Sequence, residues 1–324
     1  MAIAHREAGP VLLNSRPSMF KRRTLDLRKR LTLDTTAIVA DSLVKAVSSD
    51  RKIEDDFMDL HPVGQGSTAV VYTAVRRADG QKVALKVVRV DDQEMVTKCK
   101  QEYELMKKLN HPSIIKALDF FTFSKGTVLV LEHFDGQTMD KAVGQQANRR
   151  LNEADARRLF QQLLDAIAYM HREGVIHRDI KAQNILVSED LSELRLLDFN
   201  TACCVEDGAL TLTGTADYMP PEVLLGQSLS ESSDIWAAGV CLHVMLAGAV
   251  PLCRQQFVSH DEFGAALRTR IGAILGDTQW GHISKECKVV LCRCLVPEPL
   301  SRPTAFEVLA DAWVNPTDAS TQCT

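Results

Sequence analysis

The sequence contains no apolar run that approaches the ~18 residues needed to cross a membrane as a helix. Its N-terminus also lacks the hydrophobic core of a secretory signal. Arg and Ser residues there are typical of an organelle transit segment, but Glu7 and Asp26 argue against one. We therefore expect neither a membrane span nor secretion.

Excess positive charge is missing as well. Charged residues make up 25% of the chain and the formal net charge is -4. This balance excludes a nucleic-acid binder that depends on bulk positive charge. We expect no nucleic-acid partner.

The nine cysteines include no Cys-x-x-Cys pair and are odd in number. Cys203-Cys204 and the Cys292–Cys294 pair lack the spacing of zinc ligands. A disulfide framework is therefore excluded, and free thiols indicate a reducing compartment, so we expect a cytoplasmic protein. With 324 residues and 45% hydrophobic content, the chain can bury a large core and form more than one lobe.

Residues 1–56 form a polar N-terminal extension. The stretch 21–30, "KRRTLDLRKR", reads either as a solvated helix face or tail, or as a nuclear-import or anion-binding patch. In 35–49, the apolar positions Ile38, Val39, Leu43, Val44 and Val47 follow one helical face, which predicts a short docking helix. The extension is interpreted as autoinhibitory or as a docking arm, and the sequence does not choose between them.

From residue 57 the pattern changes to short β-branched runs with turn signals between them. It predicts three strands over 57–90, a helix at 93–110 and a hairpin over 118–134. Helices dominate afterwards, at 151–174, 233–248, 261–275, 284–295 and 304–312. We therefore predict an α+β fold with a small antiparallel sheet lobe and a larger helical lobe, and a cleft between them as a ligand site.

Two features of the small lobe indicate chemistry. Gly64 and Gly66 in "VGQGSTAVVYTA" allow the backbone to approach phosphates, although two glycines in a hairpin also form an ordinary turn. Lys86 lies in an apolar strand, "VALKVV". It either faces solvent or is held in the cleft against a phosphate and a carboxylate, for which Glu102 is the candidate.

The segment 175–187, "VIHRDIKAQNILV", places an acid, a cation and an amide between apolar strands. Asp179 is suited to accept a proton from a hydroxyl, and Asn184 to bind a metal. Asp198 follows nineteen residues after Asp179, again behind an apolar strand.

In this order, the motifs resemble the signature of eukaryotic-type protein kinases. The resemblance covers residues about 57–313 and rests on "GQGSTAVV", "VALK", Glu102 nine residues before His111, "HRDIKAQN", "DFN", "GTADYMPPE", "SDIWAAGV" and "SRPT". It implies a bilobal protein kinase fold, with a small lobe at about 57–134 and a mainly helical lobe at about 135–313, followed by a tail at 314–324. Lys181 and "GTADY" resemble serine/threonine rather than tyrosine kinases.

The resemblance implies ATP and Mg²⁺ as cofactors. The glycines would cover the phosphates, Leu131 would be the gatekeeper, and the backbone of Glu132 and Phe134 would bond adenine. The residues implied for ATP are Gly64, Gly66, Val71, Ala84, Lys86, Leu131, Glu132 and Phe134.

It also implies the catalytic set. Lys86 would pair with Glu102, Asp179 would accept or orient the substrate hydroxyl, and Lys181 would steady the transferring phosphate. Asn184 and Asp198 would hold Mg²⁺, and Thr215 would line the catalytic loop. Structural roles would fall to Glu222 with Arg302, and to Asp234 with Trp236 beneath the catalytic loop.

Regulation is implied by Arg178, which in this family usually receives a phosphate from the activation segment. Thr211 and Thr213 are the candidate phosphosites, or else ordinary loop threonines. Cys203 and Cys204 are either a redox switch or inert thiols.

Three positions depart from the family pattern: Ala69 for the third glycine of the phosphate loop, Pro220 for alanine, and Asn200 for the glycine after Asp198-Phe199. Asn tolerates a left-handed φ better than other non-glycine residues, so we expect modest strain at Asn200. Gln183 replaces the Glu that basophilic kinases often carry before the metal-binding Asn, so strong arginine dependence is not expected.

The prediction is a Mg·ATP-dependent serine/threonine kinase that acts on protein substrates and is switched by phosphorylation of its activation segment by an upstream kinase. The alternative is a pseudokinase scaffold or nucleotide-binding regulator. A dinucleotide-binding enzyme is disfavoured because the glycine loop joins antiparallel strands. The segment 233–252 resembles calmodulin-regulated kinases, but no basic amphipathic helix follows residue 313. The oligomeric state, the subfamily and the substrate stay open.

Overall fold

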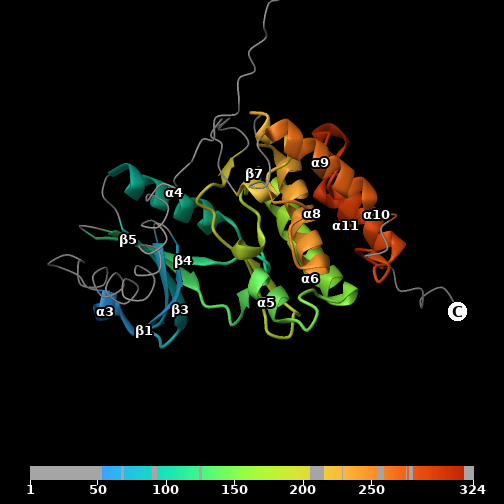
Figure 1. Ribbon diagram of the computed structural model, residues 1–324. Helices are drawn as coiled ribbons and strands as arrows, with labels where there is room; N and C mark the ends of the chain where they lie inside the picture. Colours follow the sequence, from blue (N-terminus) through green and yellow to red (C-terminus); the bar gives the residue numbers. More distant parts are fainter. Residues whose placement is uncertain are drawn as a thin grey trace, which may run out of the picture.

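An antiparallel sheet of five strands opens the described part of the chain (Figure 1). The computed structural model describes residues 53–66, 69–89, 93–123, 126–204, 215–227, 229–253, 259–274, 276 and 280–316. The strands have the order β1-β2-β3-β5-β4. Their bounds are β1 Phe57–Gln65, β2 Ala69–Arg76, β3 Lys82–Arg89, β4 Ala117–Phe123 and β5 Gly126–Glu132, and the short helix α3, Ile53–Asp56, precedes them.

The two faces of this sheet are divided by the alternation of side chains along each strand. On β3, Val83, Leu85 and Val87 are buried in a small apolar cluster that includes Phe57 of β1. The intervening Ala84 and Lys86 therefore lie on the opposite face. This register places the polar lysine on the face that turns toward the cleft.

The longer helix of this lobe, α4 (Gln93–Lys108), packs against β4 and β5. It ends two residues before the predicted stop at Asn110, and the backbone N–H of Asn110 donates to the Tyr169 hydroxyl at 2.9 Å. The helix brings Glu102 and Met106 toward the cleft.

Helices form the second lobe (Figure 1). They are α5 Met139–Gln145, α6 Glu153–Arg172, α7 Pro221–Leu224, α8 Glu231–Ala247, α9 His260–Ala273, α10 Lys285–Cys294 and α11 Ala305–Leu309. Short 3-10 turns occur at η1 Ala182–Asn184, η3 Ala216–Tyr218 and η6 Pro299–Ser301. Short strands occur at β6 Gln137–Thr138, β7 Val175–Ile176, β8 Ile185–Val187, β9 Leu194–Leu196 and β10 Cys203–Cys204.

The core of this lobe is α8, which is apolar on nearly all sides and almost wholly buried, as the sequence predicts. It packs against α6 and α10. Gly239 permits the close approach of α10, since a Cβ at this position would lie 2.8 Å from Cβ of Cys294.

Two charged residues, Glu153 and Arg302, connect the helices of this lobe to neighbouring segments. Glu153, at the start of α6, accepts hydrogen bonds from the Ser284 backbone N–H (2.7 Å) and from Trp313 Nε1 (2.7 Å). Arg302 donates to Glu222 at 2.9 Å and lies over the Trp236 ring at 5.0 Å. These contacts join segments distant in sequence into one framework beneath the cleft.

The bilobal α+β architecture predicted from the sequence is confirmed, with a five-stranded sheet and a helical lobe. The helix predicted at 304–312 is shorter, at Ala305–Leu309. The predicted helix at 35–49, the basic stretch 21–30 and residues 317–324 of the tail lie outside the described residues. None of the helices in the described ranges has the length and apolarity needed to cross a membrane.

Candidate active site

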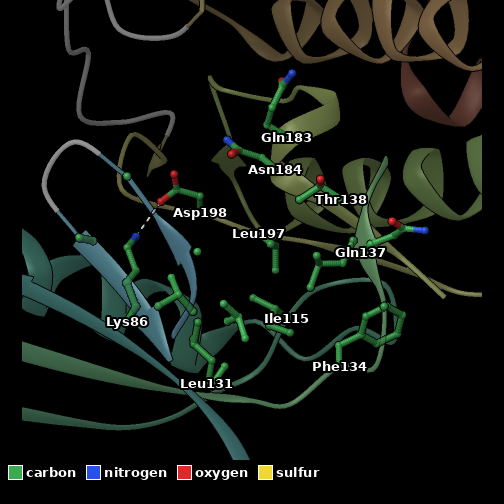
Figure 2. Close-up of a pocket in the computed structure, with 18 of the residues that line it drawn as sticks. Lys86, Ile115, Leu131, Phe134, Gln137, Thr138, Gln183, Asn184, Leu197 and Asp198 are labelled. Carbon is green, nitrogen blue, oxygen red and sulfur yellow. Dashed lines mark hydrogen bonds and ion pairs between the residues drawn. The ribbon is translucent and has the colours of Figure 1, made fainter. Parts of the chain in front are cut away.

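A cavity of about 990 Å³ opens between the sheet and the helical lobe, large enough for a nucleotide-sized ligand. Register explains its apolar wall: Val71 on β2 pairs with Lys86 on β3, and Ala84 pairs with Leu131 on β5. These side chains line the cavity together with Phe134. Figure 2 shows Lys86, Leu131 and Phe134 among the lining residues. The positions predicted for adenine therefore come together on one surface.

The glycine turn between β1 and β2 forms the outer edge of the cavity. Gly64 and Gly66 both line it, and the Gly66 N–H donates to Ala69 O at 2.8 Å. Among the described residues apart from the chain neighbours, the nearest atom to a Cβ on Gly64 would be Val71 Cβ at 3.9 Å, and to a Cβ on Gly66 it would be Ala69 O at 3.7 Å, both ordinary contact distances. The positions predicted to cover phosphates are thus at the cavity.

Lys86 links the two lobes. Its Nζ lies 2.8 Å from Glu102 Oε1 and 2.7 Å from Asp198 Oδ1. Burial alone would lower the pKa of Lys86, but the two carboxylates outweigh it and hold the pKa above its usual value. Lys86 is therefore charged and faces the cleft, which decides between the two orientations open at the sequence level.

Asp179 is held from three sides. Its Oδ1 accepts from the Thr215 N–H at 3.1 Å, while its Oδ2 accepts from Lys181 Nζ at 2.6 Å and from Asn184 Nδ2 at 3.0 Å. Lys181 Nζ also donates to the Thr215 hydroxyl at 2.9 Å. The carboxylate is thus fixed beside the cavity by Lys181, Asn184 and Thr215, which line it.

The oxygen donors predicted for Mg²⁺ fit that ion. The amide nitrogen of Asn184 donates to Asp179 O and Oδ2, so its amide oxygen is left to accept or ligate. Asp198 is partly exposed and offers a second carboxylate oxygen beside the one that binds Lys86. Oxygen ligands of this kind suit Mg²⁺, and both side chains lie at the same end of the pocket (Figure 2).

Asp234 of α8 supports the catalytic loop from below. It is fully buried and accepts hydrogen bonds from the backbone N–H groups of His177 and Arg178, each at 3.0 Å. His171 Nε2 lies 3.0 Å from the same carboxylate. Burial alone would raise the pKa of Asp234, but the hydrogen bond and charge of His171 outweigh it and lower that pKa, which keeps the carboxylate ionised.

His177 has a role that the sequence analysis did not assign, although the residue stands inside a quoted motif. Its Nε2 lies 2.9 Å from Leu197 O and its Nδ1 accepts from the Asp179 N–H at 3.3 Å. Burial lowers the pKa of His177, so the neutral ring with a proton on Nε2 satisfies both contacts. Phe199 packs edge-on against this ring at 4.8 Å.

Asn200 corrects one expectation. The left-handed residues of this region are Asp198 (φ +64°) and Arg178 (φ +70°), and Asn200 is not among the described residues with positive φ. Its side chain is exposed in a turn after the buried Phe199. The tolerance of Asn for left-handed φ is therefore not what admits it, because this position does not require that conformation.

Some of the remaining predicted positions lie among the described residues, and others do not. The Glu222–Arg302 pair is buried and hydrogen bonded, and Cys203 is a half-buried residue of β10, which pairs with β7. Arg178 has a buried Nε with no hydrogen-bond partner among the described atoms. Thr211 and Thr213 lie outside the described residues.

A family model for the protein kinase domain matches residues 57–314. The chain belongs to the protein kinase family. Within this kinase family it is 34% identical over 261 residues to the carbon catabolite-derepressing protein kinase of Candida albicans, which covers 78% of this chain and 40% of the relative.

Other kinases give similar values. The SNF1-like protein kinase ssp2 of Schizosaccharomyces pombe is 31% identical over 262 residues, covering 78% of this chain and 43% of that protein. The serine/threonine-protein kinase CG17528 of Drosophila melanogaster is 30% identical over 329 residues, covering 97% and 41%. The chain thus spans about two fifths of the length of these curated relatives.

Proposed function

We propose that the chain transfers the γ-phosphoryl group of ATP to serine or threonine hydroxyls of a protein substrate. The observation that carries this proposal is the contact of Lys86 with both Glu102 and Asp198, at 2.8 and 2.7 Å. It places a cation in the cavity that Lys181 and Asn184 also line, and both of these side chains donate to Asp179. Phosphoryl transfer depends on this kind of charge neutralisation and positioning.

The roles of the residues follow from their positions. Val71, Ala84 and Leu131 hold the adenine ring between apolar surfaces, and the backbone of Glu132 and Phe134 hydrogen-bonds its edge. Lys86 binds the α- and β-phosphates below the turn of Gly64 and Gly66. The residues in these roles all line the cavity.

At the reacting end, Asp179 orients the substrate hydroxyl and receives its proton. Lys181 moves from Asp179 Oδ2 toward the transferring phosphoryl group, while Thr215 keeps its N–H on Asp179 Oδ1. Asn184 and Asp198 hold Mg²⁺, which neutralises phosphate charge when bound. Asp234 fixes the loop that carries these groups.

Regulation is part of the proposal. Arg178 has an unpartnered buried Nε, and a phosphate on Thr211 or Thr213 supplies an acceptor for its guanidinium. An upstream kinase then acts as the activator. Residues 57–313 form the kinase domain in this proposal, with residues 1–56 as an extension, and the protein acts in the cytoplasm, or in the nucleus if the stretch 21–30 is an import signal.

The test is phosphate transfer from labelled Mg·ATP to a serine/threonine peptide library by the full chain. Asp179→Asn is the control, because it keeps the size of the side chain and removes the proton acceptor. Incorporation by the wild type that disappears in the variant supports the proposal. Equal signals from both, with nucleotide still bound, support the pseudokinase alternative.

The proposed regulation is tested with a Thr211→Ala variant that is co-expressed with its activating kinases. Full activity of this variant would contradict activation through Thr211.

A further inference from the structure

The entrance of the cavity has an uneven charge distribution. Where α5 packs against η1, the lining side chains are Thr138, Lys141 and Gln183, with Gln137 beside them. Three of these four are neutral and the fourth is a cation. Thr138 and Gln183 lie across the pocket from Lys86 (Figure 2), so this side of the entrance is separate from the inner charged cluster.

Carboxylates line the same cavity from other elements. Glu102 and Asp198 contact Lys86, and Glu132 lies 3.6 Å from Arg195 Nε and accepts from the Lys116 N–H at 3.1 Å. Asp135 belongs to the segment after β5, and Asp217 to η3. No lining carboxylate among the described residues comes from η1 or from α5.

One acidic residue of α5 needs separate mention. Asp140 does not line the cavity, and its charge acts on Tyr218, whose pKa is raised mainly by burial. Lys141, the next residue, is exposed and does line it. The helix therefore directs its cation, and not its carboxylate, to the cavity entrance.

We propose that this α5–η1 entrance binds an anionic side chain of the protein substrate, and that Lys141 determines the preference. The inference rests on the proposed kinase function and names the substrate class for it. Gln183 stands beside Asn184, next to the reacting groups, so a substrate side chain bound here lies within a few residues of the phosphoacceptor. Its amide and the Thr138 hydroxyl donate hydrogen bonds to a carboxylate or phosphate. A lysine or arginine of the substrate meets the Lys141 charge instead.

The experiment compares synthetic peptides that carry one serine phosphoacceptor and, at each flanking position in turn, Ala, Glu, phosphoserine or Lys. For the wild type we expect one position at which Glu lowers KM relative to Lys by about three- to tenfold, as an exposed charge pair allows. Phosphoserine has a larger effect there if the natural determinant is a phosphorylated residue, and an equal one if it is acidic. Raising the ionic strength should reduce the preference.

Lys141→Glu should reverse the ratio of KM values for the Glu and Lys peptides at that position. Lys285→Glu makes the same charge change at an exposed site of α10 and should keep the wild-type ratio. An unchanged ratio in Lys141→Glu, or a wild-type preference for Lys or for no charge, overturns the proposal while phosphorylation of the Ala peptide still supports the kinase function. Absence of phosphorylation of every peptide, the Ala peptide included, overturns the kinase function and this inference with it.

Discussion

The carboxylate of Asp234 holds the backbone of Arg178 in a left-handed conformation. The Arg178 N–H donates to Asp234 Oδ1 at 3.0 Å, and the Arg178 φ is +70°. A non-glycine residue in this region is strained by roughly 1–3 kcal/mol and persists only when its surroundings enforce it. The buried acid on α8 is thus a positioning residue for the adjacent Asp179.

Asp234→Asn should lower kcat by about ten- to a hundredfold, because the amide keeps one acceptor and loses the other, so that the loop relaxes and Asp179 moves. The KM for ATP should change little, since Lys86 and the adenine wall belong to other elements. Steady-state kinetics with both substrates measures this split. Glu286→Gln, at an exposed site of α10, is the control. A kcat within twofold of wild type, in a variant with unchanged thermal unfolding, contradicts the role of Asp234.

Asn200→Gly should leave kcat within about twofold, the range expected for a surface substitution. The reason is that Asn200 is exposed and its backbone does not have a positive φ, so glycine relieves no strain. The measurement is basal kinase activity and activity after activation. Asp198→Asn, which removes a carboxylate bonded to Lys86, should abolish both. A rise of more than tenfold in Asn200→Gly would show that the wild type is held inactive by its asparagine.

The sequence predicts the two-lobe fold well because its strands and helices carry strong, unmixed periodicity. The sequence "VALKVV" predicts the strand that carries Lys86 but leaves the orientation of the lysine open, and the apolar run of 233–248 identifies the buried helix α8. The motifs point to the charged positions, and the structure shows the expected pairing of Lys86 with Glu102. The contact of Lys86 with Asp198 was not predicted.

What the sequence does not predict depends on contacts between distant segments. The positive φ values fall on Asp198 and Arg178 rather than on Asn200. The Arg178 N–H is bonded to Asp234 of a distant helix, so its backbone conformation does not follow from residue type alone. The tautomer of His177 likewise depends on Leu197 O, twenty residues away. The charge of the α5–η1 entrance needs the packing of two elements that are about forty residues apart in the chain.

Gly239→Ala should destabilise the fold by about 1–3 kcal/mol through overpacking. The added Cβ would lie 2.8 Å from Cβ of Cys294 and 3.0 Å from Cδ2 of Leu295, where α8 and α10 meet. The matched control is Gly272→Ala in the last turn of α9, where a Cβ would meet no atom of the described residues within 4 Å. That change should stabilise by up to about 1 kcal/mol through helix propensity. Urea unfolding of both variants measures the difference, and equal effects would contradict the close approach of the two helices.

His243 should make the folded state sensitive to mild acid. Its ring packs against Trp280 at 5.1 Å, its Nδ1 lies 2.8 Å from Ala249 O, and burial lowers its pKa to about 4. Between the ordinary His pKa of about 6.5 and this value, the unfolded chain binds a proton that the folded chain does not. The free energy of unfolding therefore falls as the pH decreases through this window, by about 2 kcal/mol between pH 7.5 and 5.

His243→Phe keeps a ring against Trp280 and removes the titrating group. The decrease of about 2 kcal/mol in the free energy of unfolding between pH 7.5 and 5 should therefore be absent from the variant. At pH 7.5 the free energy of unfolding of the variant should be about 1 kcal/mol lower than that of the wild type, because the hydrogen bond to Ala249 is lost. Urea unfolding at the two pH values gives both numbers, with the exposed His282→Phe as the control for general effects of removing a histidine. The same pH dependence in wild type and His243→Phe would mean that the His243 ring is protonated equally in the folded and unfolded chain, against its burial beneath Trp280.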